Sequence, residues 1–134
     1  MRRHGRGRLA PPEASPDWVR YVQLLHYAEG SAMLPLMLKL YLGRLGEAAD
    51  PLKPRVASEI ENHIGWLDAE LGRADWFVAN TFSAADIQLS FVIQAARLLQ
   101  GLEKFPNLAG FLDRAKARPP YQRALERGGP SIFG

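Results

Sequence analysis

The pattern of hydrophobic and polar positions predicts a long apolar helix near the middle of the chain. From Ile87 to Ala96 the sequence carries no charge, and its only polar side chains are two glutamines and one serine. A surface helix would show a charged stripe, so this segment predicts the buried central helix of a helical domain. It is too short and too interrupted to span a bilayer, and we expect no membrane partner. We expect the helix to run from Ser83 to about Gln100, with the other elements packed around it.

Four residues specify where this central helix begins. Ser83 fits the N-cap and Asp86 the third helical position, so that each side chain can accept the backbone N–H of the other in a capping box. Phe82 and Ile87 have the spacing of a hydrophobic staple and are expected to pack on each other. Capping explains both the residue type and the position of Asp86. We therefore favour a structural role for this carboxylate over acid–base catalysis.

An apolar pattern at helical spacing predicts a first long helix from Asp17 to about Gly43, with cap candidates at Ser15-Pro16-Asp17. Its apolar residues form two faces, so we expect contacts on two sides. Pro35 lies inside the pattern and has no backbone N–H to donate. We therefore expect a kink between residues 31 and 35.

Three shorter helices complete the predicted fold. An apolar stripe predicts a helix over Pro54–Leu71 with a solvated polar face, Pro106 opens another helix, and a last one covers Tyr121–Arg127 after a break at Pro119-Pro120. Residues 76–78 could form a short extended piece. The chain has no hairpin signal and no alternating run of useful length. The predicted fold class is all-α, a five-helix bundle around a central buried helix.

The composition is that of one ordinary globular domain, with 134 residues, 47% hydrophobic and 23% charged. The absence of cysteine excludes disulfides and thiolate metal sites, and a reducing cytoplasmic location is expected. The histidines are His4, His26 and His63, and none lies three or four residues from another. We therefore expect no metal site.

The positive net charge of +3 comes from the start of the chain. Four of the 17 basic residues are arginines before residue nine, which leaves 13 basic against 14 acidic residues in the remainder. A basic face for a partner is therefore not expected. We interpret residues 1–16 as an arginine- and proline-rich linker, residues 17–128 as the helical domain and residues 129–134 as a tail. Nucleic-acid binding through the arginines is an alternative that we rank last.

The segment Phe82–Ile87 resembles the capping-box motif that opens the central core helix in the C-terminal domain of glutathione transferases. Two further stretches follow the order of that family, Leu25–Ser31 upstream and Phe105–Leu108 with Ala117–Tyr121 downstream. Together they extend from about residue 9 to residue 128. The chain is most similar to bacterial and fungal members of the family.

This resemblance implies a function in glutathione conjugation, as in detoxification. In the family, a thioredoxin-like N-terminal domain holds glutathione as co-substrate and supplies the catalytic residue, and the helical domain lines a pocket for a small hydrophobic electrophile. Neither a catalytic residue nor a glutathione site is recognised in this chain, which would begin at the linker between the domains. The resemblance therefore implies a domain that is inactive by itself, binds no cofactor alone and takes part in a homodimer.

The resemblance places Tyr27 and Glu29 at the border of the active-site cleft, and with Met33 they are the candidate substrate-binding residues. For Met33, plain core packing is the favoured alternative. A second hypothesis is a non-catalytic protein–protein interaction module of the same fold, as in the similar helical domains of translation factors and aminoacyl-tRNA synthetases. We expect the missing thioredoxin-like half to leave an exposed apolar patch that favours self-association.

Overall fold

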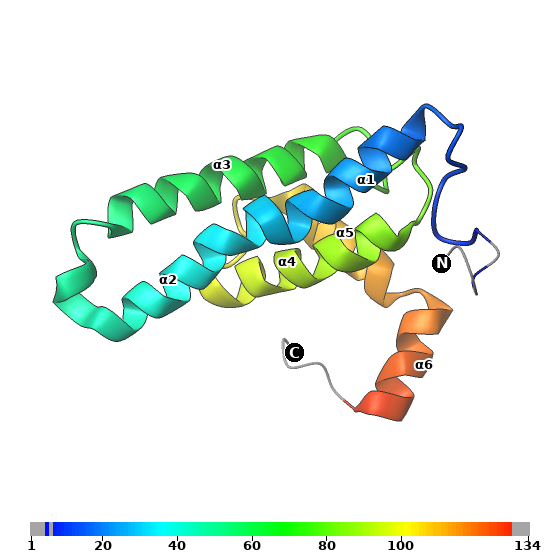
Figure 1. Cartoon of the computed structure of the whole chain (residues 1–134). Helices are drawn as coiled ribbons and strands as arrows, with labels where there is room; N and C mark the ends of the chain where they lie inside the picture. Colours follow the sequence, from blue (N-terminus) through cyan, green and yellow to red (C-terminus); the bar gives the residue numbers. More distant parts are fainter. Residues whose placement is uncertain (1–4, 6, 130–134) are drawn as a thin grey trace.

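A computed structural model describes residue 5 and residues 7–129, and these residues form helices and turns without a strand (Figure 1). The arginines at positions 2, 3 and 6 and the tail from residue 130 lie outside the described residues. The helices are α1 (Asp17–Tyr27), a π-helical turn (Ala28–Ala32), α2 (Met33–Leu45), a 3-10 turn (Gly46–Ala49), α3 (Lys53–Leu71), α4 (Ala84–Gln100), α5 (Pro106–Lys116) and α6 (Pro119–Gly128).

The helices α1 and α2 form one long rod that runs beside α3, with α4 and α5 packed against this pair (Figure 1). The central helix α4 contacts α1, α2 and α5, and α3 contacts α2 and α5. Each of these elements contributes fully buried side chains to one core, among them Leu24, Leu36, Ile60, Leu89 and Phe111. The predicted all-α bundle is therefore confirmed, with the α1–α2 rod as its first helix. The last helix, α6, turns away from the bundle and has no buried residue (Figure 1).

The junction of α1 and α2 is a π-helical turn. The N–H of Met33 donates to the carbonyl of Ala28, five residues earlier, instead of four as in an α-helix. Pro35 follows within the first turn of α2 and provides no N–H for the carbonyls of this junction. The irregularity expected between residues 31 and 35 is present, and it takes the form of one wide turn over Ala28–Ala32.

Two predicted helix boundaries are wrong, the end of α2 and the start of α6. In both places the backbone conformation of a glycine or proline, and not its presence alone, decides where the helix ends or begins. Gly43 lies inside α2, and the helix ends at Gly46, which adopts a positive φ of 60°. Pro119 and Pro120 do not precede the last helix but form its first turn, where their missing N–H groups cost nothing. Residues 76–78 form a bend and a turn and not a short extended piece.

The central helix is buried around most of its circumference, as expected, and one row of its side chains is exposed. Leu89, Val92 and Ile93 are fully buried, whereas Ile87 and Phe91 are 49% and 46% exposed. Packing against α1, α2 and α5 leaves one side of α4 uncovered in the part of the chain that the structure describes.

The carboxylate of Asp86 joins the start of α4 to the preceding loop. A capping box is present between Ser83 and Asp86, in which Asp86 Oδ2 accepts the Ser83 N–H at 2.7 Å and its hydroxyl at 2.8 Å. The other oxygen, Oδ1, accepts the N–H of Phe77 at 3.0 Å. Asp86 is fully buried, so these donors replace the water that it has lost.

The proline-rich segment before α1 also contributes to the start of α4. The carbonyl of Leu9 accepts the N–H of Ala84 at 2.8 Å. This N–H is one of the groups at a helix start that no intrahelical carbonyl can satisfy. Phe82, beside it, packs edge-on against Trp76 with ring centroids 4.8 Å apart. Phe82 and the half-exposed Ile87 line the same hollow.

Asp68 on α3 caps another helix, so the expectation that the polar face of α3 is simply solvated is wrong. Its Oδ1 accepts the N–H groups of Asn107 at 2.9 Å and Leu108 at 3.1 Å, and its Oδ2 accepts the Asn107 side-chain amide at 3.0 Å. These N–H groups lie in the first turn of α5. The carboxylate therefore provides from a neighbouring helix the cap that α5 lacks in its own sequence.

We predict that Asp86→Asn lowers the free energy of unfolding by about 2–4 kcal/mol, because the amide cannot accept hydrogen bonds at both ends and leaves a buried donor unpaired. Urea denaturation of the full chain measures this loss. The control is Asp113→Asn on the exposed side of α5, for which a change within about 0.5 kcal/mol is expected. A loss below about 1 kcal/mol for Asp86→Asn would show that the network contributes little.

Candidate functional site

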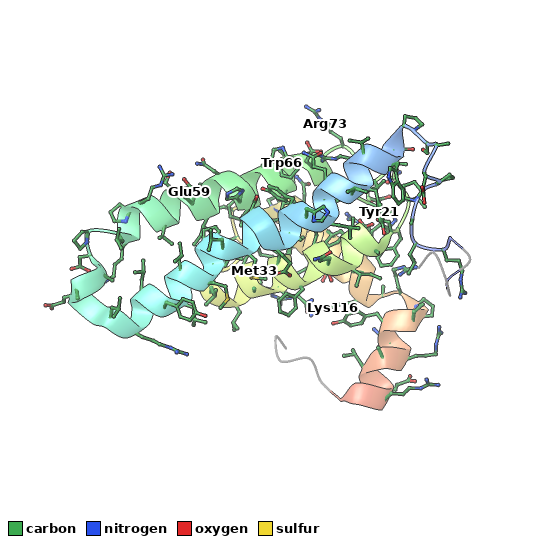
Figure 2. The ribbon with its side chains drawn as sticks, in the orientation of Figure 1. Tyr21, Met33, Glu59, Trp66, Arg73 and Lys116 are labelled. Carbon is green, nitrogen blue, oxygen red and sulfur yellow. The ribbon has the colours of Figure 1, made fainter. Side chains whose placement is uncertain are left out.

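Tyr27, the first of the predicted substrate-binding residues, faces α3. Its hydroxyl oxygen lies 2.8 Å from His63 Nδ1. Its ring packs edge-on against Trp66 with centroids 4.8 Å apart. Both partners are on α3, along which Figure 2 also shows Glu59. Tyr27 thus links the last turn of α1 to the middle of α3.

Further charged side chains from α3 and α1 lie beside the contact between Tyr27 and His63. His63 Nε2 lies 3.6 Å from Glu59 Oε2, and Arg20 forms an ion pair with Glu70. The Arg20 guanidinium also lies 4.9 Å from the centre of the Trp66 ring. Sequence reasoning missed this cluster. The i,i+4 spacing of Glu59 and His63 is visible in the sequence, but nothing local connects either residue to Tyr27.

Glu29 and Met33 lie at the π-helical turn but in different surroundings. Glu29 is within the turn and exposed to solvent. Met33 follows the turn, is only 7% exposed and belongs to the hydrophobic core. Figure 2 shows Met33 where α2 passes α4. The three predicted residues are therefore neighbours along the rod, with one directed to α3, one in solvent and one in the core.

Exposed apolar side chains follow α2 and α4. On α2 four of them recur at helical spacing, which places them on one side of the helix: Leu34, Leu38, Tyr41 and Leu45. A fifth, Leu40, is 39% exposed and lies off this row. On α4 they are Ile87, Phe91 and Leu98. We call these two sets the apolar stripes. The helices that carry them pack against each other.

The apolar stripes are the strongest indication of an interaction surface in the structure. Leu34 and Leu45 are 56% and 60% exposed, and Leu98 is 65% exposed. Single exposed apolar residues are common, whereas rows of large ones on neighbouring helices are typical of surfaces that another molecule covers. No described helix is long and apolar enough to cross a membrane.

The model of the glutathione S-transferase C-terminal domain matches residues 50–127 of the sequence. A comparison with curated proteins gives no significant match. The family match includes α3, α4 and α5 together with the capping residues Asp68 and Asp86.

Solved structures of glutathione S-transferases share the fold. The enzyme from Actinobacillus pleuropneumoniae superposes with a TM-score of 0.81 at 18% identity, over 96% of this chain and 61% of that one. The beta-class enzyme from Sphingomonas chungbukensis gives 0.71 at 25% identity, over 91% and 59%. A sphingomonad enzyme complexed with glutathione gives 0.71 at 28% identity, over 92% and 60%.

The chain thus spans about 60% of the length of these relatives, and the match extends over nearly all of its own helices. The family model covers more than half of the 134 residues. On these grounds the chain belongs to the glutathione S-transferase C-terminal domain family.

Proposed function

We propose that this chain acts as the helical domain of a glutathione transferase and forms one wall of an apolar pocket for a small hydrophobic electrophile. The other wall would come from a thioredoxin-like domain that binds glutathione as co-substrate. The observation that carries the proposal is the pair of apolar stripes on α2 and α4. The sphingomonad relative, whose structure contains glutathione, supports the choice of co-substrate.

The apolar stripes fit this role by their chemistry. Full burial of a large apolar side chain contributes about 1.5–3 kcal/mol to the free energy of association. Several such residues can therefore hold a second domain. The same surface can leave an apolar gap for an electrophile wherever the two domains do not touch. Stripe residues that the second domain leaves uncovered would bring two copies together, and we propose a homodimer on these grounds.

The three candidate substrate-binding residues stay in the proposal with separate roles. Tyr27 and Met33 flank the π-helical turn and Glu29 lies within it, and such turns are frequent at functional sites. Glu29, exposed within the turn, would contact the polar end of a ligand or the partner domain. Met33, nearly buried, would shape the wall from behind. No residue of the chain is assigned to catalysis.

Tyr27 would offer a neutral hydroxyl and not a base. Burial raises the pKa of Tyr27 to about 12, and the positive charge of Arg20 limits this rise. The hydroxyl therefore stays protonated at neutral pH. Through His63 it would keep the end of α1 in place beside the proposed pocket.

We further propose that the protein works in the cytoplasm, that residues 17–128 are the functional domain, and that residues 1–16 and 129–134 are linker and tail. The alternative of a non-catalytic interaction module uses the same apolar stripes, but with a protein partner and no electrophile.

Conjugation of glutathione to a chlorodinitrobenzene, followed by absorbance, tests the proposed function. We predict no turnover by the chain alone. A chimera in which the chain replaces the helical region of the sphingomonad enzyme should conjugate glutathione. Turnover by the purified chain at the rate of the relatives would contradict the dependence on a second domain. A folded but inactive chimera would favour the interaction module.

Matched variants of that chimera test the apolar stripes. Leu38→Glu on α2 should reduce turnover by roughly tenfold or more, because the carboxylate would have to be buried against the second domain. Val19→Glu makes the same change at a residue of α1 that is 75% exposed and outside the stripes. It should leave turnover unchanged within about twofold. Equal effects of both variants would argue against docking through the stripes.

An absorbance titration near 295 nm tests the state of Tyr27. Its pKa is higher in the folded protein than the ordinary 10.0, so its contribution to stability is full below pH 10 and is lost as the pH rises toward 12. We predict that the latest step of tyrosinate formation disappears in Tyr27→Phe and persists in Tyr41→Phe. A late step that persists in Tyr27→Phe would contradict the assignment.

A further inference from the structure

The turn that joins α2 to α3 projects beyond the rest of the bundle. Figure 1 shows this end of the α2–α3 hairpin extending past the end of α4 and the start of α5. Large apolar side chains are exposed on the last turns of α2 and in the loop before α3: Leu40, Tyr41, Leu45 and Leu52. We call these four residues the hairpin tip. Leu40 and Leu52 belong to neither apolar stripe, so docking of a second domain on the stripes does not account for them.

The composition of α2 explains why its end exposes apolar side chains. From Met33 to Leu45 the helix carries only two charges, those of Lys39 and Arg44. A helix that is apolar nearly all round is normally covered on all sides. Met33 and Leu36 near its beginning are buried in the core, whereas its last turns lie outside the bundle (Figure 1). The hairpin tip therefore presents an apolar surface that a buried helix would hide.

The end of the molecule around the hairpin tip is positively charged. Residues 39–55 contain four basic and two acidic residues, whereas the rest of the chain after residue 8 contains nine basic and twelve acidic residues. Ion pairs with acidic neighbours hold two of these basic residues: Lys53 with Asp50, and Arg55 with Glu59. Within the described part of the chain, the unpaired charges of this segment are the cations Lys39 and Arg44 and the anion Glu47. The hairpin tip is thus accompanied by an excess of free positive charge.

A hollow of about 380 Å³ lies beside the hairpin tip, between α2, α3 and the end of α4. Lys39 and Lys53 are among its lining residues, together with the apolar Leu42. Its acidic lining residue, Glu61, is paired with Lys104, whose Nζ lies 3.9 Å from Glu61 Oε1. A phosphate group at this hollow would therefore meet ammonium groups from both helices of the hairpin.

Exposed leucines and a tyrosine beside free basic residues are the combination by which proteins attach to an anionic membrane surface. Leucine enters the boundary between headgroups and acyl chains, tyrosine lies at the level of the headgroups, and lysine and arginine contact the lipid phosphates. Because the hairpin tip projects, a fluid lipid surface can cover its apolar residues on several sides at once. The expectation of no membrane partner concerned spanning segments, and attachment to a surface does not need one.

We propose that the hairpin tip attaches the protein to the surface of an anionic membrane. Leu45 and Leu52 insert at the acyl boundary, while Arg44 and the two lysines of the hollow, Lys39 and Lys53, contact the lipid headgroups. The inference does not rest on the proposed function, since neither glutathione nor an electrophile takes part in the attachment.

Flotation of the full chain with lipid vesicles tests the proposal. The vesicles contain equal parts of phosphatidylcholine and phosphatidylserine, and vesicles of phosphatidylcholine alone are the neutral control. We predict that the chain binds the anionic vesicles roughly tenfold or more tightly than the neutral ones, and that high salt weakens this binding. Equal binding to both kinds of vesicle, or no binding to the anionic vesicles, would overturn the proposal.

Matched variants locate the contact. Leu52→Glu should reduce binding to the anionic vesicles by roughly tenfold or more, whereas Val19→Glu, at an exposed residue of α1, should leave it within about twofold. Arg44→Gln should weaken binding by roughly fivefold. Arg73→Gln, beyond the opposite end of α3 in Figure 2, should leave it within about twofold. Circular dichroism melts check that each variant is folded.

Equal effects of Leu52→Glu and Val19→Glu on vesicle binding would overturn the assignment to the hairpin tip. Sedimentation of the chain without lipid separates a membrane from a second copy as the partner of this surface. A chain that self-associates through Leu52 and does not bind vesicles would assign the tip to a second copy and overturn the membrane proposal.

Discussion

The buried carboxylate of Asp86 is the interaction on which the arrangement of this domain depends. One oxygen holds the start of α4 through Ser83, and the other holds the loop that follows α3 through Phe77. Burial raises the pKa of Asp86 above its ordinary value, and the hydrogen bonds from Phe77 and Ser83 oppose that rise. A buried carboxylate destabilises the folded state unless its oxygens accept hydrogen bonds. The donor groups around Asp86 must therefore keep fixed positions. Both the direction of α4 and the surfaces it presents follow from that specificity.

A second carboxylate, that of Asp68, also caps the start of a helix, and it does so from a neighbouring helix. Asp68 on α3 accepts N–H groups from the first turn of α5, as Asp86 does from the start of α4. The core helices α4 and α5 therefore begin at fixed points and pack against each other, and Leu89 and Phe111 are fully buried in the common core. Helix α6 has no side-chain cap and buries no residue. It stands apart from the core and leaves the hollow beside Phe82.

The parts of this structure that the sequence predicts well are those determined by residues close together in the chain. The capping box lies within four residues, so the start of α4 at Ala84 could be placed from Ser83 and Asp86 alone. The contacts of Asp68 with Asn107, and of Tyr27 with His63, join residues far apart and gave no local signal. The exposed side of α4 could not be foreseen either, because an apolar segment does not reveal which of its sides a neighbour covers. The three proposed substrate-binding residues came from the family resemblance and remain a proposal.

Amide hydrogen exchange in the folded chain tests the central role of Asp86 most directly. The N–H groups of Phe77 and Ser83 belong to a loop and a helix start, where exchange is normally fast. If the Asp86 network holds the domain together, both should exchange only through global unfolding, as slowly as Leu89 and Ile93 in the middle of α4. Exchange of these two amides at the rate of the exposed loop around Arg73 would contradict the account.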